Sequence, residues 1–222
     1  MGNEVITNNH TTKIIAKTFL WMFMGILATA IISWYTYSTG MAVAFATNGT
    51  YLVLMLVELI VVLLCSLFFH KLPPLVVSIL YFVYAVLNGV TMSTIFAIFE
   101  LNSIVIIFGA SALLFGLFAV LGFFTKRDIS KISTLLFGTL IIGIIVSVIN
   151  LFLGNTMLDL ILSWVMLFVF FGITAYDMQH LKALANRTNA DDQKVYIYGA
   201  MQLYLDFINI FLRVLNIFGS RK

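Results

Sequence analysis

Apolar residues form seven long runs along this chain, and short polar segments separate them. Each run has about 20 residues, the length at which a helix crosses the hydrocarbon core of a bilayer. The separators include "KLPP", "ELN", "TKRDISK" and "GNT", which are too short to hold a domain of their own. We therefore predict an all-α polytopic membrane protein with a single transmembrane domain over residues 1–222. The seven predicted spans cover about 19–37, 51–70, 75–99, 103–124, 132–153, 157–178 and 195–218.

The composition agrees with this prediction. Of the 222 residues, 62% are hydrophobic and 9% are charged, whereas soluble domains have about 25% charged residues. A surface exposed to water cannot be built from so few charges. The formal net charge of +3 belongs to the loops, where it indicates topology and not nucleic-acid binding. The single cysteine, Cys65, has no second cysteine for an internal disulfide.

Lysine and arginine residues predict the orientation, because cytoplasmic loops carry an excess of them. With a cytoplasmic N-terminus, Arg221 and Lys222 lie outside and Arg213 lies within the last span. We expect no cleavable signal peptide before the first span, and we expect a bacterial cytoplasmic membrane, with the endoplasmic reticulum as the alternative. The nine cations on the predicted inner side are Lys13, Lys17, Lys71, Lys126, Arg127, Lys131, Lys182, Arg187 and Lys194.

A polar stripe runs along the last predicted span at intervals of four, three, four and three residues. At this spacing the side chains share one face of a helix. Such a face on an apolar helix must meet protein or water, so we predict that the last helix is central in the bundle. The stripe consists of Gln202, Asp206, Asn209, Arg213 and Asn216.

Span 3 carries a shorter stripe of Tyr81, Tyr84, Asn88 and Thr91. We expect spans 3 and 7 to share a polar core. The alternative is that the amide side chains only hold helices together, at about 0.6 kcal/mol for each interhelical hydrogen bond. Arg213 has its own alternative, because it lies near enough to the outer end to extend its charge into the interface.

Three acidic residues lie within the predicted spans: Glu58, Asp177 and Asp206. An ionised side chain near the bilayer centre costs about 2.5–3.5 kcal/mol on insertion scales, so such residues face the bundle interior or water. Two carboxyl groups in contact share a proton and titrate as a unit, which makes a proton-dependent clasp between helices. Asp206 is nominally deeper than Asp177, so contact requires a tilt or a late start of the last helix. Alternatively, Asp177 is a solvated residue at a helix end.

The segments "ITAYDMQHLK" and "GAMQLYLDFINIFLRVL" resemble the paired C-terminal signatures of the Bax inhibitor family, also called the transmembrane BAX inhibitor motif family. Further similar segments are "LVELIVVLL", "LNGVTMSTIF" and "FGLFAVLGFFTKRDISKISTLLFGTLIIGIIVSVINLFL", so the resemblance covers spans 2 to 7. It implies seven helices with the last one central. It also implies a calcium leak that pH controls through an aspartate pair, here Asp177 and Asp206. In bacterial members an arginine near the end of span 2 latches the first aspartate, whereas this chain has only His70 or Lys71 as candidate latches.

We therefore expect a pH-sensitive calcium leak channel and not an enzyme, with Asp177 and Asp206 as pH sensor and gate. Glu58 is expected to lie on the cation path or to act in gating. Calcium is the permeant ion, in transient contact with these three acids, and no cofactor is expected. The expected partners are calcium, protons and the lipid bilayer, with no nucleic acid and with other membrane proteins unspecified.

Two other functions stay open. A proton-sharing pair also suits a proton-coupled cation transporter that exchanges Ca²⁺ for H⁺. A regulator of cell death or of a membrane protease, with no transport of its own, is the third. An intramembrane aspartyl protease is disfavoured, because that class requires Gly-x-Gly-Asp where this chain has Leu-Tyr-Leu-Asp at 203–206.

Overall fold

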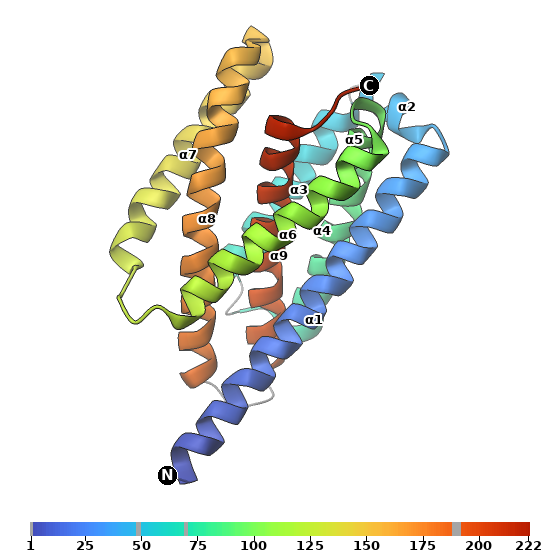
Figure 1. Cartoon of the computed structure of the whole chain (residues 1–222). Coiled ribbons are helices and arrows are strands. Elements are labelled where there is room, and N and C mark those ends of the chain that lie inside the picture. The colour runs from blue at the N-terminus through green and yellow to red at the C-terminus, as the bar shows by residue number, and fades with distance from the viewer. Residues whose placement is uncertain (1, 48–49, 69–70, 188–191) are drawn as a thin grey trace. The chain divides into compact units, whose positions relative to one another are not determined.

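The computed structural model describes residues 2–47, 50–68, 71–187 and 192–222 (Figure 1). Among these residues there is no strand, and one isolated antiparallel bridge joins Phe99 and Arg221. The prediction of an all-α protein is therefore confirmed. The helices are α1 (Gly2–Ser38), α2 (Met41–Thr47), α3 (Thr50–Phe68), α4 (Pro74–Met92), α5 (Ile95–Ile98), α6 (Leu101–Phe124), α7 (Ser130–Leu153), α8 (Thr156–Arg187) and α9 (Gln193–Phe218).

Six helical segments of the described chain are long and apolar enough to cross a membrane. They are His10–Ser38, Pro74–Ile98, Leu101–Phe124, Ser130–Leu153, Thr156–Arg187 and Gln193–Phe218. The predicted second span corresponds to α3, whose qualifying apolar stretch, Val53–Leu64, is shorter. The protein is thus an integral membrane protein with six candidate spans. The seventh crossing and the central place of the last helix stay predictions, although α9 has the largest buried share of the six, 67%.

Helix starts and ends follow local chemistry. Pro73 is extended and Pro74 opens α4, where its missing N–H is tolerated. Helix α7 ends at Gly154, which adopts φ 61°, a conformation that glycine enters at little cost. The Asn155 side chain then accepts hydrogen bonds from the backbone N–H groups of Met157 and Leu158, at 3.0 and 3.1 Å, and so caps the start of α8.

The helices differ from the predicted spans at four main places. Helix α1 begins at Gly2, well before the predicted start at 19, and the predicted third span, 75–99, is divided between α4 and α5. A short helix, α2, lies within "STGMAVAFATNG", where no element was expected. Helix α8 continues to Arg187, beyond the predicted end of the sixth span at 178. The added segment, "QHLKALANR", is more polar than the run before it, but Leu, Lys, Ala and Arg are good helix formers. Hydrophobicity therefore marked the end of the apolar run and not the end of the helix.

The chain divides into two compact units. Unit 1 contains Met1–Phe99, Leu184–Tyr204 and Arg221–Lys222, and unit 2 contains Glu100–Ala183 and Leu205–Ser220. Helices α8 and α9 each contribute residues to both units. The prediction of one transmembrane domain over the whole chain stays a prediction.

In unit 1, α4 packs against α1 and α3. Helix α4 lies close to α1 at Gly89, where an added Cβ would lie 2.8 Å from the Thr29 carbonyl oxygen. Tyr81 is fully buried and donates a hydrogen bond to the Trp21 carbonyl oxygen at 2.9 Å. The predicted stripe of span 3 thus lies in the interior of unit 1, and all four of its side chains are buried.

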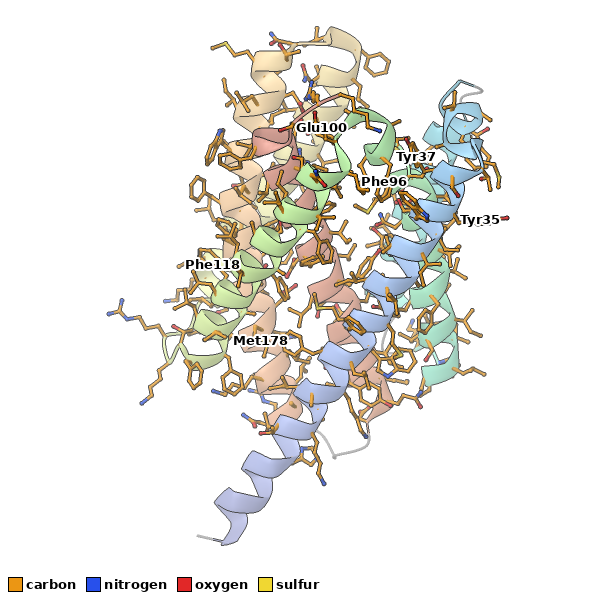
Figure 2. All side chains as sticks on the ribbon, turned by 45° about the vertical axis from the view of Figure 1, so that its right-hand side comes forward. Tyr35, Tyr37, Phe96, Glu100, Phe118 and Met178 are labelled. Atoms are coloured by element: carbon orange, nitrogen blue, oxygen red, sulfur yellow. The ribbon has the colours of Figure 1, made fainter. Side chains whose placement is uncertain are left out.

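Arg221 and Lys222, which belong to unit 1, contact residues near the ends of α1 and α5. The Lys222 backbone N–H donates to the Ile98 carbonyl oxygen at 3.0 Å, and its Nζ donates to the Phe96 carbonyl oxygen at 2.7 Å. The rings of Tyr37 and Phe96 lie side by side there, with centroids 5.6 Å apart (Figure 2). Arg221 lies over the Phe99 ring at 5.7 Å. Carbonyl and ring contacts therefore bind both cations of the tail. These are the two cations that the predicted orientation places on the outer side, against the usual excess of Lys and Arg on the inner side.

In unit 2, α7 and α8 run antiparallel (Figure 1). An added Cβ at Gly143 of α7 would lie 2.3 Å from the Met166 sulfur of α8. Helix α6 also approaches α8 closely, because the rings of Phe118 and Phe171 stack at 4.2 Å. Small and aromatic residues thus set the packing around α8.

Candidate functional site

Two aspartates face each other in unit 2. Asp177 lies on α8, just before the Met178 labelled in Figure 2, and Asp206 lies on α9. Their exposed fractions are 5% and 3%. The charge of Asp177 acts directly on Asp206. The expected pairing of these two carboxyl groups thus has a geometric basis, and Asp177 is not a solvated residue at a helix end.

The surroundings of the pair offer few polar partners. The Thr174 hydroxyl, one turn before Asp177, donates to the Phe170 carbonyl oxygen of its own helix at 2.8 Å and also lies near Asp206. Asp177 Oδ1 and Asp206 Oδ2 are buried and have no hydrogen-bond partner. A buried carboxylate without a partner is costly, so the two groups depend on each other and on bound protons.

The extension of α8 brings the two aspartates to comparable depth. Asp177 is ten residues before the end of α8 at Arg187, and Asp206 is thirteen residues after the start of α9 at Gln193. At a rise of about 1.5 Å per residue, the two positions differ by about one helical turn. The tilt or late helix start that the sequence seemed to require is thus replaced by a longer α8.

The residues after Asp177 hold the segment between α6 and α7. Gln179 Nε2 donates to the Arg127 carbonyl oxygen at 2.8 Å, and Gln179 Oε1 accepts from the Ile129 N–H at 3.3 Å. Lys182 Nζ donates to the Phe123 carbonyl oxygen at 2.8 Å. The motif "DMQHLK" therefore combines one member of the aspartate pair with the anchor of a basic loop.

A second polar contact joins α8 and α9 nearer the start of α8. Asn216 Nδ2 donates to Asp159 Oδ2 at 2.8 Å and to Ser163 Oγ at 2.7 Å. Arg213 is half-buried and interacts with the charge of Asp159. Polar groups thus connect the two helices at both ends of their contact in unit 2. Asn216 has the interhelical role that was the alternative for the amides, and Arg213 faces an acid.

A separate polar cluster lies in unit 1 around Glu58 of α3. Asn88 Nδ2 donates to Glu58 Oε2 at 3.2 Å, and Thr91 Oγ1 donates to Glu58 Oε1 at 2.9 Å. The Tyr204 hydroxyl of α9 donates to Asn88 Oδ1 at 3.0 Å. Helices α4 and α9, the third and seventh predicted spans, therefore do share a polar contact, which includes α3 as well.

The remaining predicted residues are less informative. Asn209 donates to the Leu205 carbonyl oxygen of its own helix at 2.8 Å, and Gln202 is half-buried. Of the candidate latches, Lys71 is exposed and His70 lies outside the described residues. No group of three or more His, Cys, Asp or Glu side chains in the described part of the chain is arranged to hold a metal ion.

Sequence reasoning missed five polar residues of these clusters: Thr29, Asp159, Ser163, Thr174 and Tyr204. Thr174 and Asp177 are three residues apart, and Asp159 and Ser163 are four apart, so helical spacing along α8 was a usable signal. Tyr204 lies off the polar stripe of its helix, and Thr29 stands alone on an apolar helix. No pattern in the sequence distinguishes those two from packing residues.

Comparisons with known proteins show the family to which this chain belongs. The family model for the inhibitor of apoptosis-promoting Bax1 matches residues 11–222. The inner membrane protein YbhL of Escherichia coli is 36% identical over 213 residues, which is 93% of this chain and 91% of YbhL. An uncharacterized protein of Deinococcus radiodurans is 36% identical over 219 residues, 97% of this chain and 94% of the relative. An uncharacterized protein of Borreliella burgdorferi is 31% identical over 224 residues, which is 99% of this chain and 95% of the relative. The chain is therefore a member of the Bax inhibitor family of membrane proteins.

Proposed function

We propose that this protein is a passive calcium pathway whose gate is the pair Asp177 and Asp206. One observation carries the proposal. Two buried carboxyl groups on neighbouring helices act on each other, and one oxygen of each lacks a hydrogen-bond partner. At this depth, two ionisable side chains cost more free energy than a contact that only holds two helices together would require.

The gate works through the number of protons on the pair. With one proton shared, the two carboxyl groups attract each other and hold α8 to α9. With both groups ionised they repel, or they recruit a hard cation that prefers oxygen ligands. Opening of the pair and entry of calcium are therefore favoured by the same loss of a proton.

Calcium passes through this pathway and does not stay. A tight calcium site has six to eight oxygen ligands, and two carboxyl groups supply far fewer. Glu58 contributes a further acid in unit 1, where we propose that it acts in gating. The protein acts without catalysis and needs no resident cofactor. By its likeness to the inner membrane protein YbhL, a bacterial cytoplasmic membrane is the proposed location, and the Lys and Arg residues of the loops favour an N-terminus inside.

Calcium flux into proteoliposomes tests the proposal. The external pH is varied between about 5 and 8, which brackets shifted carboxyl values. The wild type is compared with Asp177→Asn, Asp206→Asn and Glu58→Gln. We expect each aspartate variant to lose the pH dependence of the flux. Asp128→Asn is the matched control, because Asp128 is an exposed carboxylate of the α6–α7 loop, and its variant keeps the wild-type profile.

The same experiment separates the alternatives. A proton-coupled transporter would show calcium movement that follows an imposed proton gradient, even against the calcium gradient. A regulator without transport would show no flux above empty liposomes in any variant. Full pH dependence in both aspartate variants would rule out the gate while leaving a leak in place.

A further inference from the structure

The cluster around Glu58 continues through unit 1 as a chain of hydrogen bonds. Beyond Asn88, the Tyr204 hydroxyl lies 2.6 Å from Thr29 Oγ1, and Thr29 Oγ1 donates to the Ala85 carbonyl oxygen at 2.9 Å. Asn88, Tyr204 and Thr29 are all buried. The chain therefore crosses from α3 through α4 and α9 to α1, with every link at hydrogen-bond distance.

The hydroxyl protons of these residues are too few to form a hydrogen bond at every contact in this chain. Tyr204 and Thr29 each have one hydroxyl proton, but together they make three contacts: to Asn88 Oδ1, to each other and to the Ala85 carbonyl oxygen. If Tyr204 donates to Asn88 and Thr29 donates to Ala85, no proton lies between the two hydroxyls. With Glu58 ionised, the chain is short of one proton.

One added proton removes this deficit. If Glu58 Oε2 carries a proton and the Asn88 amide makes a half-turn, Glu58 donates to Asn88 Oδ1 and Asn88 Nδ2 donates to the Tyr204 oxygen. Tyr204 then donates to Thr29, and Thr29 donates to the Ala85 carbonyl oxygen. Only the Glu58 O–H bond is new, no other atom gains or loses a proton, and all four links are served. Thr91 Oγ1 lies 2.9 Å from Glu58 Oε1 and 3.0 Å from the Asn88 carbonyl oxygen, and its proton can be donated to Glu58 in either arrangement.

We propose that Glu58 and the relay of Asn88, Tyr204 and Thr29 form a proton-binding site in unit 1, separate from the aspartate pair. The polarity of the contacts favours a proton over a metal ion as the ligand. Both Glu58 oxygens face hydrogen-bond donors, an N–H and an O–H, which repel a cation. The titratable groups that face Glu58 are the neutral phenols Tyr84 of α4 and Tyr204 of α9. The sequence of α2, the other helix packed on α3, contains no titratable side chain.

Infrared difference spectroscopy tests the site without any measurement of ion flux. The full-length protein in lipid nanodiscs is titrated from neutral to acid pH, and the carbonyl stretch of protonated carboxyl groups is recorded. We expect a band that is lost in Glu58→Gln. In Tyr204→Phe, the arrangement with protonated Glu58 loses two hydrogen bonds, and the arrangement with ionised Glu58 loses one. The midpoint of the band in Tyr204→Phe should therefore fall by about 0.4 to 1 pH unit.

Tyr81→Phe is the matched control. Tyr81 is a fully buried tyrosine whose hydroxyl binds the Trp21 carbonyl oxygen and no member of the relay, so its variant should keep the wild-type midpoint. Thr29→Val tests the far end of the relay and should lower the midpoint similarly, while Thr29→Ser should keep it. An unchanged band in Glu58→Gln would overturn the proton site. Equal midpoints in Tyr204→Phe and Tyr81→Phe, or in Thr29→Val and Thr29→Ser, would overturn the relay. Because the band does not depend on calcium, loss of the proposed leak would leave these results interpretable.

Discussion

The close approach of α6 and α8 at Gly122 makes a strong prediction about stability. A Cβ added at Gly122 would lie 2.1 Å from the Ala175 carbonyl oxygen and 2.7 Å from its Cα. Both atoms belong to the backbone, so no side-chain rotation relieves the overlap. Gly122→Ala therefore forces α6 and α8 apart, two residues from Asp177.

The magnitude follows from this geometry. Overpacking in a well-packed interior costs about 1–3 kcal/mol, and a backbone clash lies at the upper end. For a chain of this size each kcal/mol moves the melting temperature by about 2–4 °C. Gly122→Ala should thus lower the melting temperature by about 6–12 °C. Gly116, on the same helix, has no atom within 4 Å of an added Cβ, and Gly116→Ala gains up to about 1 kcal/mol of helix propensity.

Thermal unfolding in one detergent, followed by tryptophan fluorescence, measures the difference between the two variants. The double variant Gly122→Ala, Ala175→Gly is a further check. It should not recover stability, since the clash is with the backbone of residue 175. A Gly122→Ala protein that melts together with Gly116→Ala would refute the close approach of α6 and α8.

Three further predictions concern other parts of the chain. Asn216→Leu loses two interhelical hydrogen bonds and should lower the free energy of unfolding by about 2 kcal/mol. Asn209→Leu loses only a hydrogen bond within α9 and should lower it less. Melting curves of the two variants measure the difference. The Ser130 N–H lowers the pKa of Asp128, so ionised Asp128 stabilises the start of α7 above the ordinary carboxyl value of about 4, and this contribution is lost as the pH falls through the lowered value. Asp128→Asn should therefore melt slightly below the wild type at pH 7 and together with it in strong acid. In a variant without the native cysteine, Asp128→Cys and Ser220→Cys should react with an impermeant maleimide from opposite sides of the membrane. Labelling of both from one side would contradict three crossings by α7, α8 and α9.

The order and type of the helices could be read from the sequence, because a membrane span is a local property. About 20 apolar residues in succession satisfy the bilayer without any tertiary contact. The predicted boundaries at 124, 153 and 218 are the ends of α6, α7 and α9 in the structure. Where a helix continues in polar sequence, as α8 does to Arg187, this local signal ends before the helix does.

The candidate site was only partly readable. Asp177, Asp206 and Glu58 were visible because an acid within an apolar run conflicts with its surroundings. Tyr204 and Thr29 do not stand out in the sequence, since a tyrosine or threonine on an apolar helix is an ordinary packing residue. Their place in the relay depends on four helices that meet side chain to side chain.

The sequence by itself determined that this is an all-α membrane protein and that three acids lie inside its spans. These conclusions rest on composition and spacing along one helix at a time. Only the tertiary structure decided that Asp177 and Asp206 face each other in unit 2 while Glu58 joins Asn88 and Tyr204 in unit 1. The physical reason is that a carboxyl group acquires its chemistry from the helices packed around it, and those helices are distant in the sequence.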